Sequence, residues 1–429
     1  SELEKSMDFQ LDLLQKQAVE EALTKGVVVV TGGPGTGKTT TINLMIRCFE
    51  MEKMDIVLAA PTGRAAKRMT EATGYEAKTI HRLLEVSGGI EDGDSSHFEK
   101  NEDNPIEADA VILDEMSMVD IHLMYSLLKA IVPGTRLILV GDSNQLPSVG
   151  PGNVLKDIID SKAFSVVRLS KIYRQAESSH IVLNAHKINA GELITLDNKN
   201  KDFFFFEKKD VRSVMGALVY LVKTRLPEYI GASPFEIQVL TPMRKGELGV
   251  EHLNEVLQYY LNPASESKKE KEGRTGVFRE GDKVMQVKNN YKLEWKITNA
   301  KGFSIEEGLG VFNGDMGIIK QINTYSERIT VVFDENREAE YPFSSLDELE
   351  LAYAITIHKS QGSEYPAVVL PLLSGPPILC NRNLLYTAIT RAQKCVAIAG
   401  RQSMVEQMIH NETEQKRYSG LNDCLKEGL

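Results

Sequence analysis

The sequence has few cysteines and no long apolar segment. Its four cysteines lie far apart and form no CxxC pair, which argues against a zinc ribbon or a disulfide framework and favours a reducing compartment; they are Cys48, Cys380, Cys395 and Cys424. No apolar run approaches the roughly 18 residues that a membrane-spanning helix needs. The first residues, Ser1 to Lys5, are charged and lack the apolar centre of a signal peptide. We therefore expect neither a membrane span nor a secretion signal.

The sequence also lacks an excess of positive charge. It contains 50 basic and 60 acidic residues, for a net charge of −10, so any nucleic-acid site has to be a local cluster of cations. With 42% hydrophobic and 26% charged residues, the composition is that of a globular chain. A chain of 429 residues is long enough for about three domains.

Short apolar runs alternate with helical patterns in the first part of the chain. The runs lie at 27–30, 56–60, 111–113 and 137–140, and the helical patterns at 39–50, 63–73 and 121–131. Runs that are apolar throughout are typical of parallel strands buried on both faces, and the alternation indicates βαβ units. A second series of runs lies at 203–206, 237–240, 367–370 and 396–399. The sequence therefore predicts an α/β fold with two parallel-sheet domains.

A region with few helical patterns interrupts the second series of apolar runs. Short strand-like pieces separated by Gly, Asn and Asp predict a small inserted β-barrel at 276–346. We expect the first domain at 1–160 and the second at 161–275 and 347–429. The segment 265–274 (SESKKEKEGR) is so highly charged that we expect a mobile loop. The aromatic run 203–206 predicts a buried strand, and the single tryptophan, Trp295, is expected to pack locally. We favour these interpretations over a role of either feature in stacking on nucleic-acid bases.

The segment 85–107 has an unusual charge, with eight acidic residues and one lysine. We interpret it as an exposed insertion in the first domain, either a solvated loop or a small functional hairpin. Ile90 and Phe98 are the apolar candidates in it for a steric wedge.

The strongest local motif is GGPGTGKT at 32–39, which matches G-x-x-x-x-G-K-[ST] between a predicted strand and a predicted helix. Backbone N–H groups of such a loop, together with the start of the helix, surround phosphates. We expect Lys38 to reach the β- and γ-phosphates of a nucleotide and Thr39 to bind Mg²⁺. The motif and the residue after it supply the candidate nucleotide-binding set Gly33, Pro34, Gly35, Thr36, Gly37, Lys38, Thr39 and Thr40.

Two further polar groups follow predicted strands. Asp114 and Glu115 end the apolar run at 111–113, and they are candidates to bind Mg²⁺ and to deprotonate the attacking water, respectively. Gln145 lies in the polar segment 141–150 after the next strand. Because ligands bind at the carboxyl ends of parallel strands, we expect Gln145 to sense the γ-phosphate.

Nine blocks occur in a set order: GGPGTGKT, APTGRAAKR, TIHRLL, VILDEMSM, GDSNQLPSVG, IYRQ, VLTPMRKGELG, AITIHKSQGSEY and LLYTAITRA. Together they resemble superfamily 1 helicases, most of all the RecD-like branch that moves 5′→3′. The resemblance runs from about residue 11 to 401. It implies two RecA-like P-loop domains, an SH3-like barrel in the second, and ATP-dependent unwinding of DNA during repair or recombination, with ATP and Mg²⁺.

The resemblance assigns further residues to ATP. Gln15 corresponds to the glutamine that reads adenine, with Gln17 as the alternative. Arg174 and Arg391 correspond to two arginines that reach the γ-phosphate, a role that suits the bidentate guanidinium group. Gly362 and Glu364 correspond to the nucleotide-facing end of their block.

The resemblance also assigns nucleic-acid contacts, on loops that follow strands. In the first domain these are Pro61, Thr62, Gly63, Arg64, Thr79 and His81; in the second they are Thr241, Pro242, Arg244, Thr356, His358, Lys359, Ser360 and Gln361. Asn313 lies in a loop of the barrel that is either another contact or a plain turn. Local cations of this kind can hold a single strand despite the net charge.

The family implies single-stranded DNA and duplex junctions as partners, and we expect a cytoplasmic bacterial monomer associated with the nucleoid. About ten residues precede the adenine-reading segment, whereas larger relatives carry a long N-terminal region, so we expect a compact member or an excised motor. The acidic segment 85–107 occupies the place of a strand-splitting pin. The alternatives are a motor subunit that is inert without partner proteins, an RNA or RNA–DNA translocase, and the helicase half of a relaxase.

Overall fold

The computed structural model describes residues 11–87, 97–173, 176, 178–274, 276–299, 303–413 and 417–428. The chain divides into two compact units, residues 1–186 with 414–429, and residues 187–413. Each unit contains one parallel sheet, which confirms the predicted fold class. Among the described residues, no helix is both long and apolar enough to cross a membrane.

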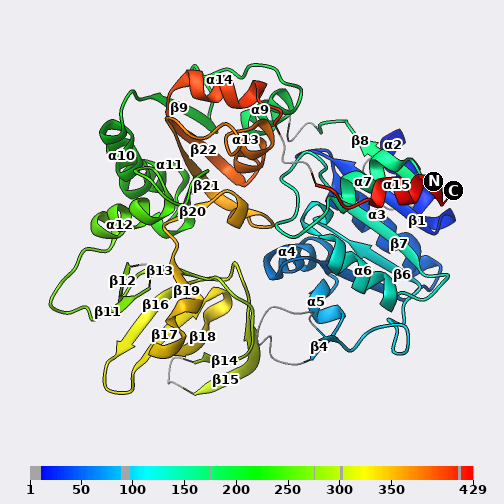
Figure 1. The fold of residues 1–429 in the computed structure, drawn as a ribbon, viewed down its shortest axis with the longest axis horizontal. Helices are drawn as coiled ribbons and strands as arrows, with labels where there is room; N and C mark the ends of the chain where they lie inside the picture. Colours follow the sequence, from blue (N-terminus) through cyan, green and yellow to red (C-terminus); the bar gives the residue numbers. More distant parts are fainter. Residues whose placement is uncertain are drawn as a thin grey trace. The chain divides into compact units, whose positions relative to one another are not determined.

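The first unit contains a six-stranded parallel sheet with the order β3-β2-β6-β7-β1-β8. Its strands β6, β7, β1 and β8 are labelled in Figure 1. The strands are β1 (Val27–Gly32), β2 (Ile56–Ala60), β3 (Ala77–Thr79), β6 (Ala110–Leu113), β7 (Arg136–Gly141) and β8 (Ser165–Leu169). The four central strands coincide with the four apolar runs of the sequence. β8 pairs with β1, with Val167 opposite Val30, so the first sheet continues past residue 160, where we expected the domain to end.

Helices cover both faces of this sheet, because the pleat sends alternate side chains to opposite sides. Val28 and Val30 of β1 pack with α2 (Leu13–Thr24) and α3 (Lys38–Met51), whereas Val29 belongs to the core formed with α6 (Ile121–Ala130) and α7 (Val154–Ser161). The C-terminal helix α15 (Leu421–Glu427) also packs on this second face, although the sequence predicted its place in the second domain. A helix of seven residues is too short for its periodicity to identify its partner.

The acidic segment contains two short strands that pair in antiparallel orientation. β4 (Val86–Ser87) pairs with β5 (His97–Phe98), with Val86 opposite Phe98. Phe98 packs against the core of the first unit, and its ring lies 6.0 Å from that of His81. Ile90 and the rest of 88–96 lie outside the described residues.

The second unit contains a five-stranded parallel sheet with the order β20-β10-β21-β22-β9. The strands are β9 (Phe203–Glu207), β10 (Ile237–Thr241), β20 (Ala354–Thr356), β21 (Tyr365–Leu372) and β22 (Ala392–Gly400). The helices of this α/β part are α10 (Val211–Tyr220), α11 (Leu226–Ile230), α12 (Val250–Leu261), α13 (Arg382–Ile389) and α14 (Gln402–His410). The aromatic run at 203–206 is strand β9, with Phe203 and Phe205 buried, as predicted.

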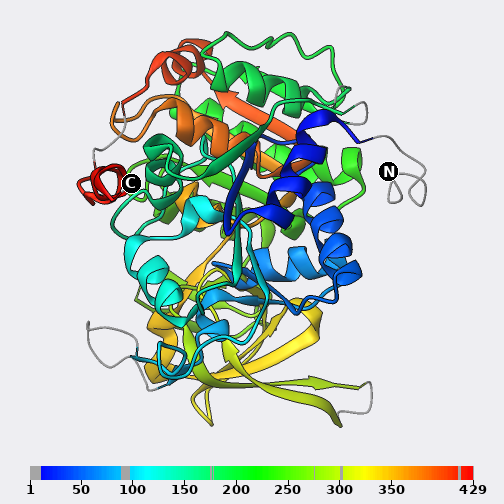
Figure 2. The same ribbon diagram turned by 90° about the vertical axis from the view of Figure 1, so that its right-hand side faces the viewer.

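An antiparallel β-barrel is inserted between β10 and β20, as the sequence predicted. Its seven-stranded sheet has the order β15-β14-β18-β17-β16-β13-β19, formed by β13 (Lys283–Gln286), β14 (Asn290–Thr298), β15 (Ser304–Val311), β16 (Met316–Asn323), β17 (Arg328–Phe333), β18 (Arg337–Pro342) and β19 (Leu349–Leu351). β14 and β15 form a long ribbon, seen in yellow-green in Figure 2. The prediction of a mobile loop at 265–274 was wrong in part, because β11 (Glu270–Gly273) pairs with β12 (Gly276–Arg279).

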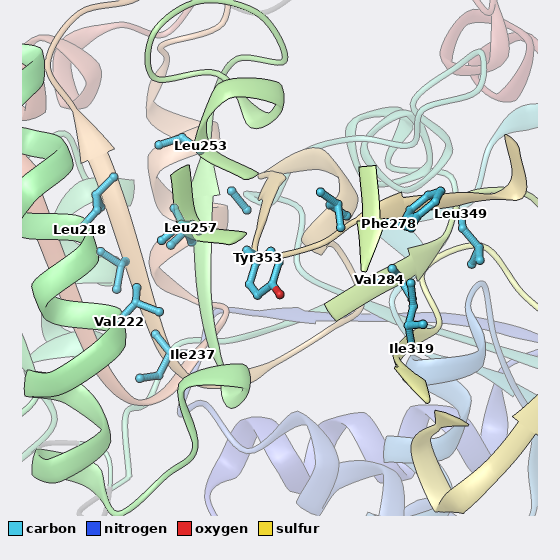
Figure 3. Packing of buried hydrophobic residues seen from close by; sticks show 14 of the residues in the cluster. Leu218, Val222, Ile237, Leu253, Leu257, Phe278, Val284, Ile319, Leu349 and Tyr353 are labelled. Carbon is cyan, nitrogen blue, oxygen red and sulfur yellow. The ribbon is translucent and has the colours of Figure 1, made fainter. Parts of the chain in front are cut away.

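The barrel and the second parallel sheet share one hydrophobic core (Figure 3). Leu218 and Ile237 come from the α/β part, whereas Val284 and Ile319 come from the barrel. Tyr353, in the segment that leads from the barrel back to β20, lies between the two groups (Figure 3). A continuous core of this kind makes the barrel an integral part of the second unit.

A buried carboxylate joins the same two parts by hydrogen bonds. Asp282 accepts hydrogen bonds from Gln258 at 2.6 Å and Asn262 at 2.7 Å, both from α12 or its end. It also accepts the Tyr353 hydroxyl at 2.9 Å and the Arg279 N–H at 2.6 Å. Burial raises the pKa of Asp282, while these four donors oppose that shift. A buried carboxylate is tolerated because both of its oxygens are used.

Removal of one donor should therefore weaken the second unit. For Tyr353→Phe we expect a loss of about 1–3 kcal/mol in the free energy of unfolding, because a buried charged acceptor loses a partner. The control is Tyr325→Phe, since Tyr325 is 99% exposed on the barrel and its hydroxyl supports no core contact. Urea denaturation followed by circular dichroism measures both; equal stability of the two variants would contradict a structural role for this hydrogen bond.

Candidate functional site

The candidate phosphate-binding loop connects β1 to α3 in the first unit. Gly35 and Gly37 adopt left-handed backbone conformations, with φ of 72° and 82°, which favour glycine. A side chain at Gly32 would also collide with the Thr36 hydroxyl and the Leu169 backbone. The loop ends at the first residue of α3, Lys38, so the unpaired N–H groups of a 14-residue helix face the loop.

The polar side chains of this loop fold back onto its own backbone. The Lys38 ammonium group donates to the carbonyl oxygens of Gly32 at 2.6 Å and Gly33 at 3.1 Å. The Thr36 hydroxyl donates to the Gly33 carbonyl at 2.8 Å. Thr39 is exposed at the start of α3. These contacts hold Lys38 at the loop, where it is available to a phosphate that replaces the two carbonyls.

Gln15 lies against the same loop, from the start of α2. Its side chain takes part in a capping box with Asp12, whose carboxylate accepts the N–H groups of Leu14 and Gln15. The residue is only 1% exposed, yet its Nε2 group donates no hydrogen bond, and a side chain at Gly37 would come within 2.8 Å of it. An unsatisfied buried donor beside a phosphate-binding loop fits the expected adenine-reading role.

Two segments that the sequence did not predict support the loop. The Tyr173 N–H donates to the Gly35 carbonyl at 3.2 Å, and the Tyr173 hydroxyl donates to Asp12 at 2.9 Å. The His186 ring nitrogen Nε2 lies 3.1 Å from the Pro34 carbonyl oxygen. All of these residues belong to the first unit. The contacts span more than 130 positions of sequence, so no local pattern could reveal them.

Asp114 and Glu115 follow β6, and the phosphate-binding loop follows β1. Only β7 separates these two strands in the sheet, so the carboxyl ends of all three lie at one edge. Gln145 follows β7 at the same edge; its Oε1 atom is buried without a hydrogen-bond partner, and its Nε2 lies 3.5 Å from Asp142. The three candidate groups are thus brought together, with an unsatisfied acceptor among them.

Burial sets the protonation chemistry of the carboxylate pair. It is the main cause that raises the pKa of Asp114 to about 6, and the neighbouring charge of Glu115 adds to it. The Glu115 N–H, Arg68 and Lys38 act in the opposite direction. Arg68 of α4 (Gly63–Thr73) forms an ion pair of 2.7 Å with Glu115.

Thr39 and Asp114 fit the way in which proteins usually bind a magnesium ion. Within the described part of the chain, no cluster of three or more His, Cys, Asp and Glu side chains is placed to hold a metal. Magnesium does not need such a cluster, because it keeps several waters and binds one or two protein ligands together with phosphate oxygens. Thr39 and Asp114 supply that donor set.

The candidate nucleic-acid contacts of the first unit lie at the far end of the same sheet edge. The segment with Pro61, Thr62, Gly63 and Arg64 joins β2 to α4, and Thr62 caps this helix by accepting the Ala65 N–H. Thr79 ends the adjacent strand β3 and caps α5 (Ile80–Leu83). Burial lowers the pKa of His81, so we expect a neutral ring there.

In the second unit, the candidate contacts follow two neighbouring strands. Thr241 ends β10 and lies directly opposite Thr356, the last residue of β20. Thr241 and Ser360 are fully buried, and their hydroxyls donate to the carbonyls of Leu248 and Ile357. These two residues therefore support the loops from within. The accessible members of the set are Arg244, Thr356, His358 and Lys359, whereas Pro242 and Gln361 are buried.

A carboxylate holds the two cations of this cluster together. Glu350 of β19 accepts Arg244 at 2.6 Å on one oxygen and Lys359 at 3.1 Å on the other. Arg244 also lies 3.5 Å from Glu251. Burial disfavours the ionised form of Glu350, but the hydrogen bonds from Arg244 and Lys359 outweigh this effect and lower its pKa. Glu350 was not among the predicted residues, because it is 106 positions from Arg244 in the sequence.

The remaining candidates are placed as follows. Arg391 is 2% exposed, and its guanidinium donates to the Thr387 and Ser363 carbonyls of its own unit at 3.3 Å. Gly362 has φ of 71°, and Glu364 is exposed and accepts Gln393 at 3.4 Å. Asn313 lies in the turn closed by the Asp315 N–H and the Phe312 carbonyl. Arg174 lies outside the described residues.

Three family models match different parts of the chain. An AAA domain model matches residues 15–151, and a model described as "ATP-dependent RecD-like DNA helicase SH3 domain" matches residues 253–333. A model described as "UvrD-like helicase C-terminal domain" matches residues 351–399. The order of these matches follows the order of the first sheet, the barrel and the second sheet.

Curated relatives resemble almost the whole chain. A protein of Deinococcus radiodurans named "ATP-dependent RecD2 DNA helicase" is 36% identical over 386 residues, which are 90% of this chain and 48% of that protein. The "RecBCD enzyme subunit RecD" of Mycolicibacterium smegmatis is 31% identical over 445 residues, which are 96% of this chain and 74% of the relative. The RecD subunit of Mycobacterium tuberculosis H37Rv is 33% identical, with 92% and 70% covered. The chain thus spans about half the length of the first relative.

Solved structures support the fold. The Pif1 helicase from Bacteroides in complex with ADP-AlF3 and single-stranded DNA is similar at a TM-score of 0.53 and 20% identity, with 94% of each chain covered. The Bacteroides Pif1 bound to single-stranded DNA gives a TM-score of 0.52 at 19% identity.

The Glu350 ion pairs should stabilise the second unit at neutral pH. We expect Glu350→Gln to lower the free energy of unfolding by about 1 kcal/mol at pH 7. The loss is this small because both cations are partly exposed to water, which screens the ion pairs. A lowered pKa gives stability that is present above the ordinary value of about 4.5 and is lost as the pH falls through the folded-state value. The difference from wild type should therefore shrink below pH 4.5. Urea titrations between pH 7 and 3.5 measure it, with exposed Glu266→Gln as the control.

Proposed function

Because the chain belongs to the RecD-like branch of the superfamily 1 helicases, we propose that it is an ATP-dependent DNA helicase that moves 5′→3′ along single-stranded DNA. The observation that carries this function is the edge of the first sheet. There the phosphate-binding loop, the carboxylates Asp114 and Glu115, and Gln145 meet, with unsatisfied polar atoms on Gln15 and Gln145. A site for ATP hydrolysis needs these groups in this proximity.

In this function each group of the first unit has one task. Lys38 and the backbone N–H groups of Gly33 and of residues 35–40 bind the phosphates, and Gln15 reads the adenine. Thr39 and Asp114 hold Mg²⁺, which neutralises phosphate charge when it is bound. Glu115 takes a proton from the attacking water, and Gln145 orients that water through its unsatisfied oxygen. Arg174 and Arg391 stabilise the charge that develops on the transferred phosphoryl group.

The DNA strand is bound by loops of both units. In the first unit, Thr62 and Thr79 each cap the start of a helix. Backbone N–H groups and hydroxyls at these two positions can donate hydrogen bonds to phosphates. In the second unit Arg244 and Lys359 supply positive charge near Thr356. Hydrolysis that alternately tightens these two sets of contacts would move the protein along one strand. With the family as support, we also propose the 5′→3′ direction, a role in repair or recombination, and a monomer in the bacterial cytoplasm.

A second candidate function is that of a motor subunit that needs partner proteins. It is favoured by the relatives named as RecD subunits of the RecBCD enzyme, at 31% and 33% identity. The two candidates share the ATP and DNA sites described above. They differ in whether the chain separates strands alone.

Strand separation on tailed duplexes tests the proposed function. We expect the purified chain to unwind a duplex with a 5′ single-stranded tail and not one with a 3′ tail, while ATP turnover rises with single-stranded DNA. Lys38→Ala is the control that should abolish both activities, because it removes the phosphate-binding cation. DNA-stimulated turnover without unwinding would favour the motor subunit. Absence of DNA-stimulated turnover would contradict both.

Glu115→Gln tests the assignment of the general base. We expect ATP turnover to fall by a factor of roughly 10²–10⁴, because an amide cannot accept the proton from water. Binding of a fluorescent ATP analogue should persist, since the phosphate-binding loop is unchanged. Wild-type turnover in this variant would assign the proton transfer to a different residue.

A further inference from the structure

Arg68 connects the candidate general base to the helix that begins at the candidate DNA contact. Its Nη2 atom lies 2.7 Å from Oε1 of Glu115, with side-chain exposures of 34% and 8%. The pair joins α4 to the end of β6 across 47 positions of sequence. A contact of this length between ionised groups is a charge-assisted hydrogen bond, among the stronger kinds in proteins.

The backbone of Glu115 shows that its position is imposed by its surroundings. It has φ of 53° and ψ of 39°, a left-handed conformation that is rare for residues other than glycine. The same residue is buried and begins the short helical turn Met116–Met118. Strained positions of this type occur at active sites, where the surrounding contacts hold them. The Arg68 guanidinium group contributes to holding this carboxylate.

Helix α4 carries both ends of the connection. Arg64 and Arg68 are four positions apart, so they lie on neighbouring turns of one face of the helix. The helix begins after its cap residue, Thr62. Its buried residues, Ala65, Ala66 and Met69, lie on the side of the helix away from the two arginines. The Asp114 N–H donates to the Ala59 carbonyl, so the end of β2 that leads into α4 is also attached to the carboxylate segment. A movement of the start of α4 can therefore be transmitted to Glu115 by the Arg68 side chain.

A carboxylate in such a pair is a poor general base. One of its two oxygens is occupied by the guanidinium group, and the ion pair fixes the direction of the carboxylate, so Glu115 is not free to turn toward a water beside the nucleotide. A hydrogen bond with a donor–acceptor distance of 2.7 Å weakens markedly once that distance exceeds about 3.2 Å. A small movement of α4 is therefore enough to free the Glu115 carboxylate. Phosphates of a bound strand at the start of the helix are placed to cause such a movement.

We propose that Arg68 is a positioning residue that restrains Glu115 when no DNA is bound, and that a single strand bound at the start of α4 releases it. This mechanism rests on the proposed function and extends it, because it makes ATP hydrolysis depend on DNA. In this role Arg68 acts through its ion pair with Glu115. The restraint limits ATP consumption by the free protein.

The opposite role, in which Arg68 orients Glu115 for hydrolysis, gives a different result. Loss of a restraint raises turnover without DNA and leaves turnover with saturating DNA nearly unchanged. Loss of an orienting residue lowers turnover in both conditions. The ratio of the two rates therefore separates the roles, and it is insensitive to a uniform loss of folded protein.

The experiment measures steady-state ATP turnover of Arg68→Ala with and without saturating oligodeoxythymidylate. We expect the DNA-free rate to rise about tenfold, the DNA-saturated rate to stay within about twofold of wild type, and the ratio to fall accordingly. Arg68→Lys should retain most of the restraint, because it keeps the positive charge. Arg47→Ala is the matched control, since Arg47 is exposed on α3 and should leave both rates unchanged.

A combined variant tests whether the effect passes through the carboxylate. In Arg68→Ala with Glu115→Gln the increase without DNA should disappear. A fall of both rates in Arg68→Ala, or no change in either, would overturn the restraint. If Arg68→Ala does not fold, Arg68→Gln supplies the same comparison. Wild-type turnover that does not respond to DNA would instead contradict the proposed function, and is measured first.

Discussion

The charge balance at the buried end of β6 is the constraint on which the first unit depends. Two carboxylates are adjacent there, the partly buried Asp114 and the buried Glu115. Desolvation, together with repulsion from Glu115, raises the pKa of Asp114 to about 6. The pair is tolerated because Lys38 and Arg68 supply positive charge from two different helices. A nucleotide with its metal ion changes that balance directly. The site is therefore built to respond to charge that arrives from outside.

The second unit uses the same principle at its candidate DNA contacts. Glu350 holds Arg244 and Lys359 as a phosphate would, with one oxygen for each cation. The carboxylate keeps both cations ordered without a bound strand. In the function proposed above, the phosphates of a strand would compete with this carboxylate. Such competition would temper the affinity for DNA, which suits stepwise movement.

The barrel has a structural relation to the second sheet that its antiparallel fold alone does not suggest. One hydrophobic core passes from Leu218 and Ile237 to Val284 and Ile319. Asp282 adds hydrogen bonds from α12 and from Tyr353. Because cores packed in this way transmit movement rather than absorb it, the barrel and the second sheet should move as one body. Any contact that the barrel makes with DNA is then coupled to the second motor sheet.

The sequence by itself determined the class of fold, the phosphate-binding loop and the identity of the catalytic candidates. These features depend on local chemistry: apolar runs form strands, glycines permit the left-handed turns at Gly35 and Gly37, and carboxylates follow the strand that ends at Leu113. The tertiary structure alone decided the partners of those groups. Arg68 meets Glu115 because β2, which leads into α4, pairs with β6. Glu350 meets Arg244, 106 positions away, because the end of the barrel lies close to the loop that follows β10. The burial of Thr241 and Ser360 was likewise decided by packing, since a polar residue type does not reveal whether its hydroxyl faces a ligand or the backbone.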